Sequence, residues 1–99
     1  MPVALTPVCV WYVELRSAAQ DKPDGEAAAV ATLRRWLADL PTQPGYTQAG
    51  CLGAELLVSP AQPGLALVTS RWQSDPPEWP LPQAARGWRF RVVDTAPAR

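Results

Sequence analysis

The stretch Val8-Cys9-Val10-Trp11-Tyr12-Val13-Glu14-Leu15 decides the fold, because it predicts a β-strand that is apolar on both faces. β-Branched and aromatic residues fill it, and Pro7 marks its start. Side chains alternate between the two faces of a strand, so the face with Trp11 and Val13 is as apolar as the other. Such a strand belongs inside a sheet whose two faces both need a cover.

A helix is predicted over residues 26–40, where the apolar period changes to about 3.6 residues. The polar turn 21–25 precedes it, and Asp24 is a suitable N-cap with Glu26 in the first turn. Pro41 ends the helix, since the residue before a proline avoids the helical conformation. The stripe that faces the core consists of Val30, Leu33, Leu37 and Leu40, with Ala27 and Trp36 beside it.

The turn Pro44-Gly45-Tyr46 leads into a second predicted strand, over about residues 47–59. Gly50 and Gly53 lie within this strand. Glycine inside a strand indicates a β-bulge or a place where another group packs close to the backbone. We therefore expect one of these features there.

A hairpin connection is predicted at residues 60–64, followed by a third strand over 65–72. Residues 73–87 contain four prolines, so a long helix is not expected there. At most a turn or two of helix is expected around residues 83–86. The alternation of residues 88–93 predicts a final strand. The prolines that exclude the helix are Pro76, Pro77, Pro80 and Pro82.

The element order predicts an α+β fold, a ferredoxin-like βαββαβ antiparallel sheet in the order 4-1-3-2 with a degenerate second helix. Residues 1–99 form one domain, with loose termini at 1–7 and 95–99. In this order the third strand separates Cys9 from Cys51, so no disulfide is expected between them.

The second face of the sheet predicts a homodimer. Helices of this fold cover one face only, yet the first three strands are apolar on both faces. A monomer rarely exposes an apolar patch above a few hundred Å². A second copy related by a two-fold axis is the simplest cover. The alternative is that the proline-rich segment and the C-terminal tail fold over that face.

The composition excludes several classes of function. Nine Lys and Arg balance nine Asp and Glu, which argues against binding to nucleic acid or to a membrane surface. The chain has no His and no Asn, so imidazole-based metal ligation and nucleophile activation are excluded within it. No metal or cofactor is expected. The N-terminus lacks the pattern of a signal peptide, and with two separated cysteines we expect a cytoplasmic protein with reduced thiols.

The segments Pro44-Gly45-Tyr46, Pro63-Gly64-Leu65 and Leu67-Val68-Thr69-Ser70-Arg71-Trp72-Gln73-Ser74 resemble the antibiotic biosynthesis monooxygenase (ABM) family. The resemblance covers residues 8–79 and implies a dimeric α/β barrel with a pocket between sheet and helices. It implies cofactor-free oxidation of an aromatic or phenolic small molecule. The haem-degrading branch needs a His and the quinone-forming branch an Asn near the third-strand Trp; this chain has neither, and Val68 lies four residues before Trp72.

Five residues are candidates for binding a ligand in that pocket, and no catalytic residue is assigned: Trp72, Tyr46, Arg89, Arg91 and Trp79. Trp72 offers an indole N–H and a ring for stacking, but a large apolar residue at the end of a strand more often anchors the core. Tyr46 can line the pocket mouth or pack on the helix end. Arg89 and Arg91 share one face of the last strand, where they can bind an anion or pair with strand carboxylates. Three tryptophans can form an aromatic wall or fasten a proline-rich loop to a helix: Trp36, Trp79 and Trp88.

Two functions follow from these observations. The first is an ABM-like domain that acts as a monooxygenase or binds an aromatic molecule. The second is a non-catalytic dimeric module of the same fold, which binds a ligand or serves in assembly. An enclosed pocket lined by Trp72 and an arginine favours the first function. A space between sheet and helix that is filled by Leu, Val and Trp favours the second.

Overall fold

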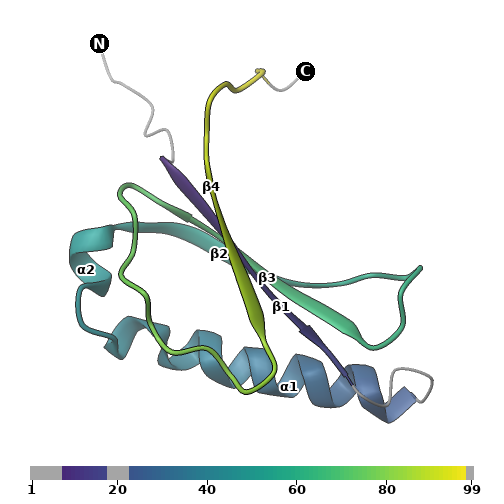
Figure 1. Cartoon of the computed structure of the whole chain (residues 1–99). Coiled ribbons are helices and arrows are strands. Elements are labelled where there is room, and N and C mark those ends of the chain that lie inside the picture. Colours follow the sequence, from purple (N-terminus) through teal and green to yellow (C-terminus); the bar gives the residue numbers. More distant parts are fainter. Residues whose placement is uncertain (1–7, 18–22, 98–99) are drawn as a thin grey trace.

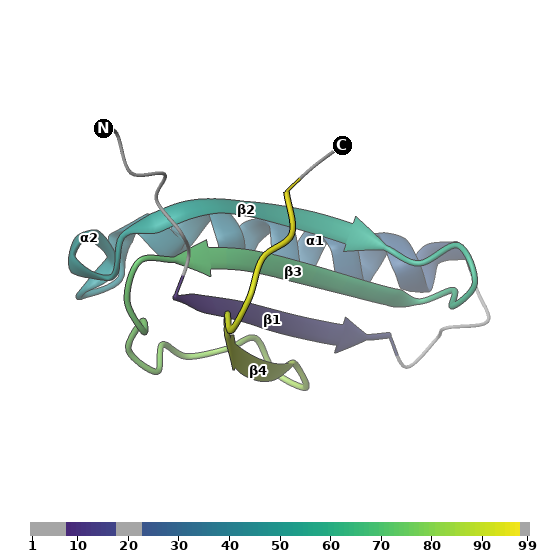
Figure 2. The ribbon, with the colours of Figure 1, turned by 90° about the horizontal axis from the view of Figure 1, so that it is seen from above.

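The computed structural model describes residues 8–17 and 23–97, in which a four-stranded sheet is covered on one face by a long helix (Figure 1). The strands lie in the order β2-β3-β1-β4 and pair antiparallel throughout (Figure 2). This is the predicted order read from the other edge, and the α+β architecture is compatible with a ferredoxin-like fold. The elements are β1 (Cys9–Arg16), α1 (Pro23–Asp39), a 3-10 turn (Leu40–Thr42), α2 (Tyr46–Ala49), β2 (Cys51–Val58), β3 (Leu65–Trp72) and β4 (Arg86–Arg91).

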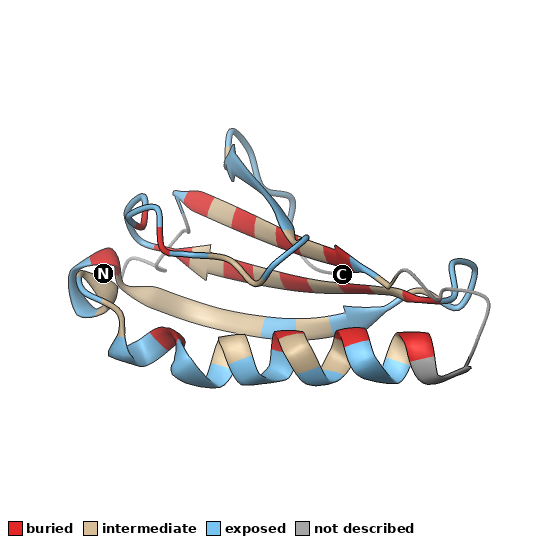
Figure 3. Cartoon of the chain, turned by 60° about the horizontal axis from the view of Figure 1, so that its bottom comes forward, coloured by how far each residue is buried: buried red, intermediate tan, exposed pale blue. Residues whose placement is uncertain are grey.

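The core lies between α1 and the face of the sheet that α1 covers, here called the helix side. Burial alternates along β1 and β3, as the red and tan bands of Figure 3 show. On α1, Leu33 is fully buried and Ala29, rather than the expected Ala27, packs beside it. Each fully buried Leu or Val stabilises the fold by about 1.5–3 kcal/mol. The strand residues buried on the helix side are Cys9, Trp11, Val13, Leu15, Ala66, Val68, Ser70 and Trp72.

The first helix begins earlier than predicted. It starts at Pro23, so residues 23–25 belong to its first turn and Asp24 is not the N-cap; residues 21 and 22 of the expected turn lie outside the described residues. Proline is well suited to a first helical position, because its φ angle is preset and its missing N–H has no partner there. The other end agrees with the prediction: α1 stops at Asp39, and Pro41 lies in the short 3-10 turn that follows.

The second strand is shorter than predicted, because residues 46–49 form the one-turn helix α2. Gly50 ends this helix with a φ of 69°, a left-handed conformation in which glycine is favoured. The expected bulge is present at the start of β2, where the register shifts between Cys51 and Gly53. The expected close approach is present too, because the guanidinium of Arg71 lies directly over Gly53.

The proline-rich segment, residues 73–85, contains no helix, so the expected degenerate second helix is absent. Its prolines cannot donate the backbone hydrogen bonds of a helix. The segment lies on the helix side of the sheet, where Pro76 and Trp79 are buried. It therefore does not cover the second face, and that alternative is wrong for this segment.

The last strand is shifted two residues toward the N-terminus of its predicted range. β4 spans Arg86–Arg91 and pairs with β1 from Glu14 to Cys9. Cys9 is the first residue of β1 and pairs with Arg91, so residues after Arg91 have no β1 residue to pair with and β4 ends there. Residues 92–97 continue without regular structure; residues 1–7, 98 and 99, also expected to be loose, lie outside the described residues.

Candidate functional site

Three of the five predicted ligand-binding residues lie together on the helix side. Trp72 ends β3, Tyr46 begins α2, and Trp79 comes from the proline-rich segment. The ring centroids of Tyr46 and Trp72 are 5.6 Å apart, and those of Trp72 and Trp79 are 5.4 Å apart. These distances are typical of packed aromatic pairs. Trp72 is 0% exposed and Trp79 is 6% exposed, so this cluster is part of the core.

The polar atoms of this aromatic cluster are already engaged. The indole N–H of Trp72 donates to Ser70 Oγ at 2.8 Å, and that hydroxyl donates to the carbonyl of Trp11. The indole N–H of Trp79 donates to the carbonyl of Pro44 at 2.6 Å. A donor that is satisfied in this way is not free for a substrate oxygen. The cluster therefore holds the fold and offers no free indole donor for oxygen chemistry.

Arg89 fastens the proline-rich segment to the sheet. Its guanidinium donates one hydrogen bond to the carbonyl of Pro76 and another, of 2.8 Å, to the carbonyl of Pro77. Its Cζ also lies 5.0 Å from the ring centroid of Trp11, a cation–π distance. Charge-assisted bonds to backbone carbonyls fix this side chain. Arg89 is thus a structural clamp.

Arg91 shares the face of Arg89, as predicted, but it is an exposed residue. Its side chain is 75% exposed, and its Nη2 lies 3.8 Å from Asp75. A small cavity of about 180 Å³ is lined by both arginines together with Cys9, Asp75 and Phe90. Burial raises the pKa of the Cys9 thiol, and the charge of Asp75 raises it further. This thiol is therefore protonated and a poor nucleophile at neutral pH.

Tyr46 and Cys51 form a second contact at the edge of the core. Burial raises the pKa of the Tyr46 hydroxyl, and its hydrogen bond with Cys51 adds to the effect. Both cysteines are free thiols, and Trp72 lies between them as the register partner of each. A phenol with a raised pKa is a weak acid–base catalyst at neutral pH.

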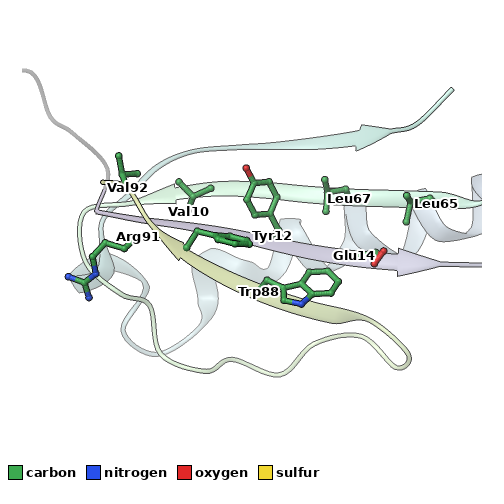
Figure 4. A pocket seen from close by; sticks show the side chains of 9 residues that line it. Val10, Tyr12, Glu14, Leu65, Leu67, Trp88, Arg91 and Val92 are labelled. Carbon is green, nitrogen blue, oxygen red and sulfur yellow. The ribbon is translucent and has the colours of Figure 1, made fainter. Parts of the chain in front are cut away.

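A wide groove lies on the other face of the sheet, here called the open face. This groove has a volume of about 610 Å³ and runs between β4 and the two central strands (Figure 4). The Tyr12 and Phe90 rings meet edge to face at 5.4 Å in its wall. Arg91 borders the groove but turns its guanidinium away from it. The lining residues are Val10, Tyr12, Glu14, Leu65, Leu67, Trp88, Phe90, Arg91 and Val92.

The apolar surface of the open face continues from the groove to the far edge of the sheet. A second hollow of about 310 Å³ shares Leu65 and Leu67 with the groove and reaches Leu57 on β2. Leu57 is 41% exposed, Trp88 40% and Phe90 55%. Four strands of up to eight residues cover about 500 Å² in flat projection. A face of this size is comparable to the largest apolar patch that monomers expose, about 300–600 Å².

Two ion pairs and one cation–π contact engage the arginines of the open face. Glu55 pairs with Arg71 at 3.1 Å, and Glu14 lies 3.7 Å from Arg16. The guanidinium of Arg86 stacks over the ring of Trp88 at 5.3 Å. A cover on this face would therefore bury two matched ion pairs together with the single charge of Arg86, which stacks on Trp88.

The open-face groove was only partly foreseen from the sequence. The alternation in the first strand placed apolar residues on this face, but the expected pocket lay on the helix side. The proposed aromatic wall is also divided: Trp36 and Trp79 both contact Trp11 on the helix side, whereas Trp88 lines the groove. The signal that identifies Trp88 and Phe90 is their alternation with Arg89, which places them on the opposite face.

The described part of the chain contains no group of three or more Cys, Asp or Glu residues arranged to hold a metal ion. Within residues 8–17 and 23–97, no helix is long and apolar enough to cross a membrane. No protein-family model, no curated protein and no solved structure matches the chain. The resemblance to the ABM family accordingly rests on the sequence motifs alone.

Proposed function

We propose that this chain is a non-catalytic assembly module that pairs with a second copy through the open face of its sheet. The monooxygenase hypothesis required a pocket beside Trp72 with a free donor. The residues expected to build that pocket instead pack against one another, and their donors are satisfied within the chain. Of the two functions that the sequence left open, the arrangement of the helix side favours the non-catalytic one.

The observation that carries the proposal is the apolar open face. The alternation that buries one side of β1 and β3 leaves Tyr12, Leu65 and Leu67 only partly buried on the other. Two sheets pack face to face about 10 Å apart. Complete contact between two such faces would bury about 1,000 Å², the lower limit of a specific interface. A two-fold axis would bring this face against itself, as a homodimer requires.

The proposal is tested by placing a charge at the centre of the open face. We expect Leu67→Asp to convert a dimer into a monomer, because the new carboxylate would be buried without a partner. The measurement is the molar mass in solution by light scattering after size exclusion, with far-UV circular dichroism to confirm folding. Phe90→Ser, at a side chain that is 55% exposed, is the second variant if Leu67→Asp fails to fold.

The matched control is Ala31→Asp, which places the same charge on an exposed position of α1. This variant is expected to keep the mass of the unmodified protein. A folded Leu67→Asp variant with the same mass as the control would contradict pairing through the open face.

The second candidate function is the binding of a flat aromatic molecule in the groove. It is favoured by the groove volume of about 610 Å³, which lies in the range of small-molecule sites, and by the rings of Tyr12, Trp88 and Phe90. Calorimetric titration with 2-naphthol tests it. Binding that is lost in Trp88→Ala supports this function, and an absence of heat with the unmodified protein counts against it.

A further inference from the structure

We propose that residues 92–97, the C-terminal arm, cross to the partner copy and pack Val93 against the open face of that copy's sheet. This inference rests on the proposed function, because it requires two sheets that face each other. It adds a specific element to the interface: Val92 joins each arm to its own sheet, and the residues beyond it would contact the partner copy.

The arm is the least packed apolar part of the described chain. Val93 is 93% exposed, the highest value among the exposed large hydrophobic residues. The last backbone contact to the sheet is the hydrogen bond from the Val92 N–H to the Val8 carbonyl, at 3.3 Å. Beyond it, the Thr95 N–H donates to the Asp94 side chain, a contact within the arm itself. Val93 follows the last residue bonded to the sheet, and its apolar side chain has no packing partner in the part of its own chain that the structure describes.

The arm stands on the open-face side of the sheet. In Figure 1 it rises from the end of β4, away from α1. In Figure 2 the sheet is seen with α1 behind it, and the yellow arm passes in front of the strands. The two views agree that the arm projects into the space that a facing copy would occupy.

The arm is long enough to reach a facing sheet. Val93 lies one residue, about 3.5 Å of extended chain, beyond the anchored Val92, and residues 93–97 together span about 16 Å; two packed sheets lie about 10 Å apart. Val93 is the first residue beyond the last sheet contact, so in the proposed dimer it would lie between the two sheets. Leu57, Leu65 and Leu67 line the half of the open face toward the far edge, where an apolar surface is available to it.

The test compares three full-length proteins and one shortened chain by sedimentation equilibrium. The proteins are the unmodified chain, Val93→Asp, the control Ala31→Asp, and a chain that ends at Val92. We expect Val93→Asp and the shortened chain to raise the dimer Kd by about 100-fold, because each dimer loses two buried valines. The control is expected to keep the Kd of the unmodified chain. Because Val93 is 93% exposed in the monomer, Val93→Asp is expected to leave the fold intact. Circular dichroism checks this.

The outcomes separate the arm from the dimer itself. A Kd unchanged in both arm variants, together with a dimer that Leu67→Asp abolishes, overturns the arm and leaves the proposed function in place. An unmodified chain that is monomeric at all concentrations overturns the proposed function and the arm with it. A raised Kd in both arm variants but not in the control supports the arm.

Discussion

Arg89 holds the proline-rich segment against the sheet, where the sequence predicted a second helix. Its guanidinium bonds to the carbonyls of Pro76 and Pro77 and lies over the ring of Trp11. Prolines leave no N–H for a helix, but their carbonyls remain strong acceptors. One arginine on β4 thereby holds in place a segment that cannot form secondary structure of its own.

The first prediction concerns this clamp. Arg89→Ala is expected to lower the free energy of unfolding by about 2 kcal/mol, because two charge-assisted hydrogen bonds and the ring contact are lost. Urea denaturation measures it. The matched control is Arg91→Ala, expected to cost less than about 0.5 kcal/mol because that exposed side chain makes only a long ion pair. Equal losses in the two variants would contradict the role of Arg89.

The second prediction concerns alkaline pH. Burial raises the folded-state pKa of Cys9 above its ordinary value of 9.0, and burial likewise raises the pKa of Tyr46 above 10.0. The unfolded chain then loses these protons first as the pH rises. Their contribution to stability is fully present below about pH 9 and is lost as the pH rises through the folded-state pKa values.

Urea denaturation at pH 7.5 and pH 10.5 measures this loss. The unfolding free energy is expected to be lower at the higher pH, and Cys9→Ala is expected to reduce the difference. A difference that is identical in Cys9→Ala would show that this thiol is not involved.

Among the secondary-structure elements, the proline-rich segment does the work of a second helix. Trp79 inserts between Trp11 and Trp72 on the sheet, and Trp36 of α1 donates its indole N–H to the Pro80 carbonyl at 2.9 Å. These contacts join the segment to the sheet and to α1 at once. The packed rings of Trp79, Trp11 and Trp72 thus cover the core at the place where a second helix was expected.

The third prediction concerns Trp79. Trp79→Ala is expected to cost about 3–5 kcal/mol, because the cavity it leaves lies between rigid rings. Trp79→Phe keeps much of the ring volume but loses the bond to the Pro44 carbonyl, so about 1–2 kcal/mol is expected. Thermal and urea denaturation measure both variants. Equal effects of the two variants would indicate that the hydrogen bond, rather than packing, holds the segment.

The elements that could be predicted from the sequence are those with a regular period. The bounds of β3 agree with the prediction, since Leu65–Trp72 alternates and follows a turn at Gly64. The one-turn helix α2 could not be predicted, because four residues carry no periodic signal and the turn depends on Gly50. The predicted site residues Tyr46, Trp72 and Trp79 do lie together, but periodicity cannot show whether aromatic rings enclose a pocket or fill it.

At the scale of the whole molecule, the chain is one sheet with a cover on one side. Its Cα radius of gyration is 14.9 Å, above the roughly 13 Å expected for a compact chain of this length. The thin architecture and the apolar open face have the same cause. The described part of the chain supplies one long helix and one proline-rich segment, and both lie on the same side of the sheet (Figure 1). A second sheet would complete the layer that is missing.

Sedimentation equilibrium of the unmodified protein over a wide range of concentrations tests this account most directly. The chain has a mass of 10.7 kDa, and the account predicts that the measured mass rises to twice that value as the concentration increases. A mass that stays at 10.7 kDa up to millimolar concentration would contradict it.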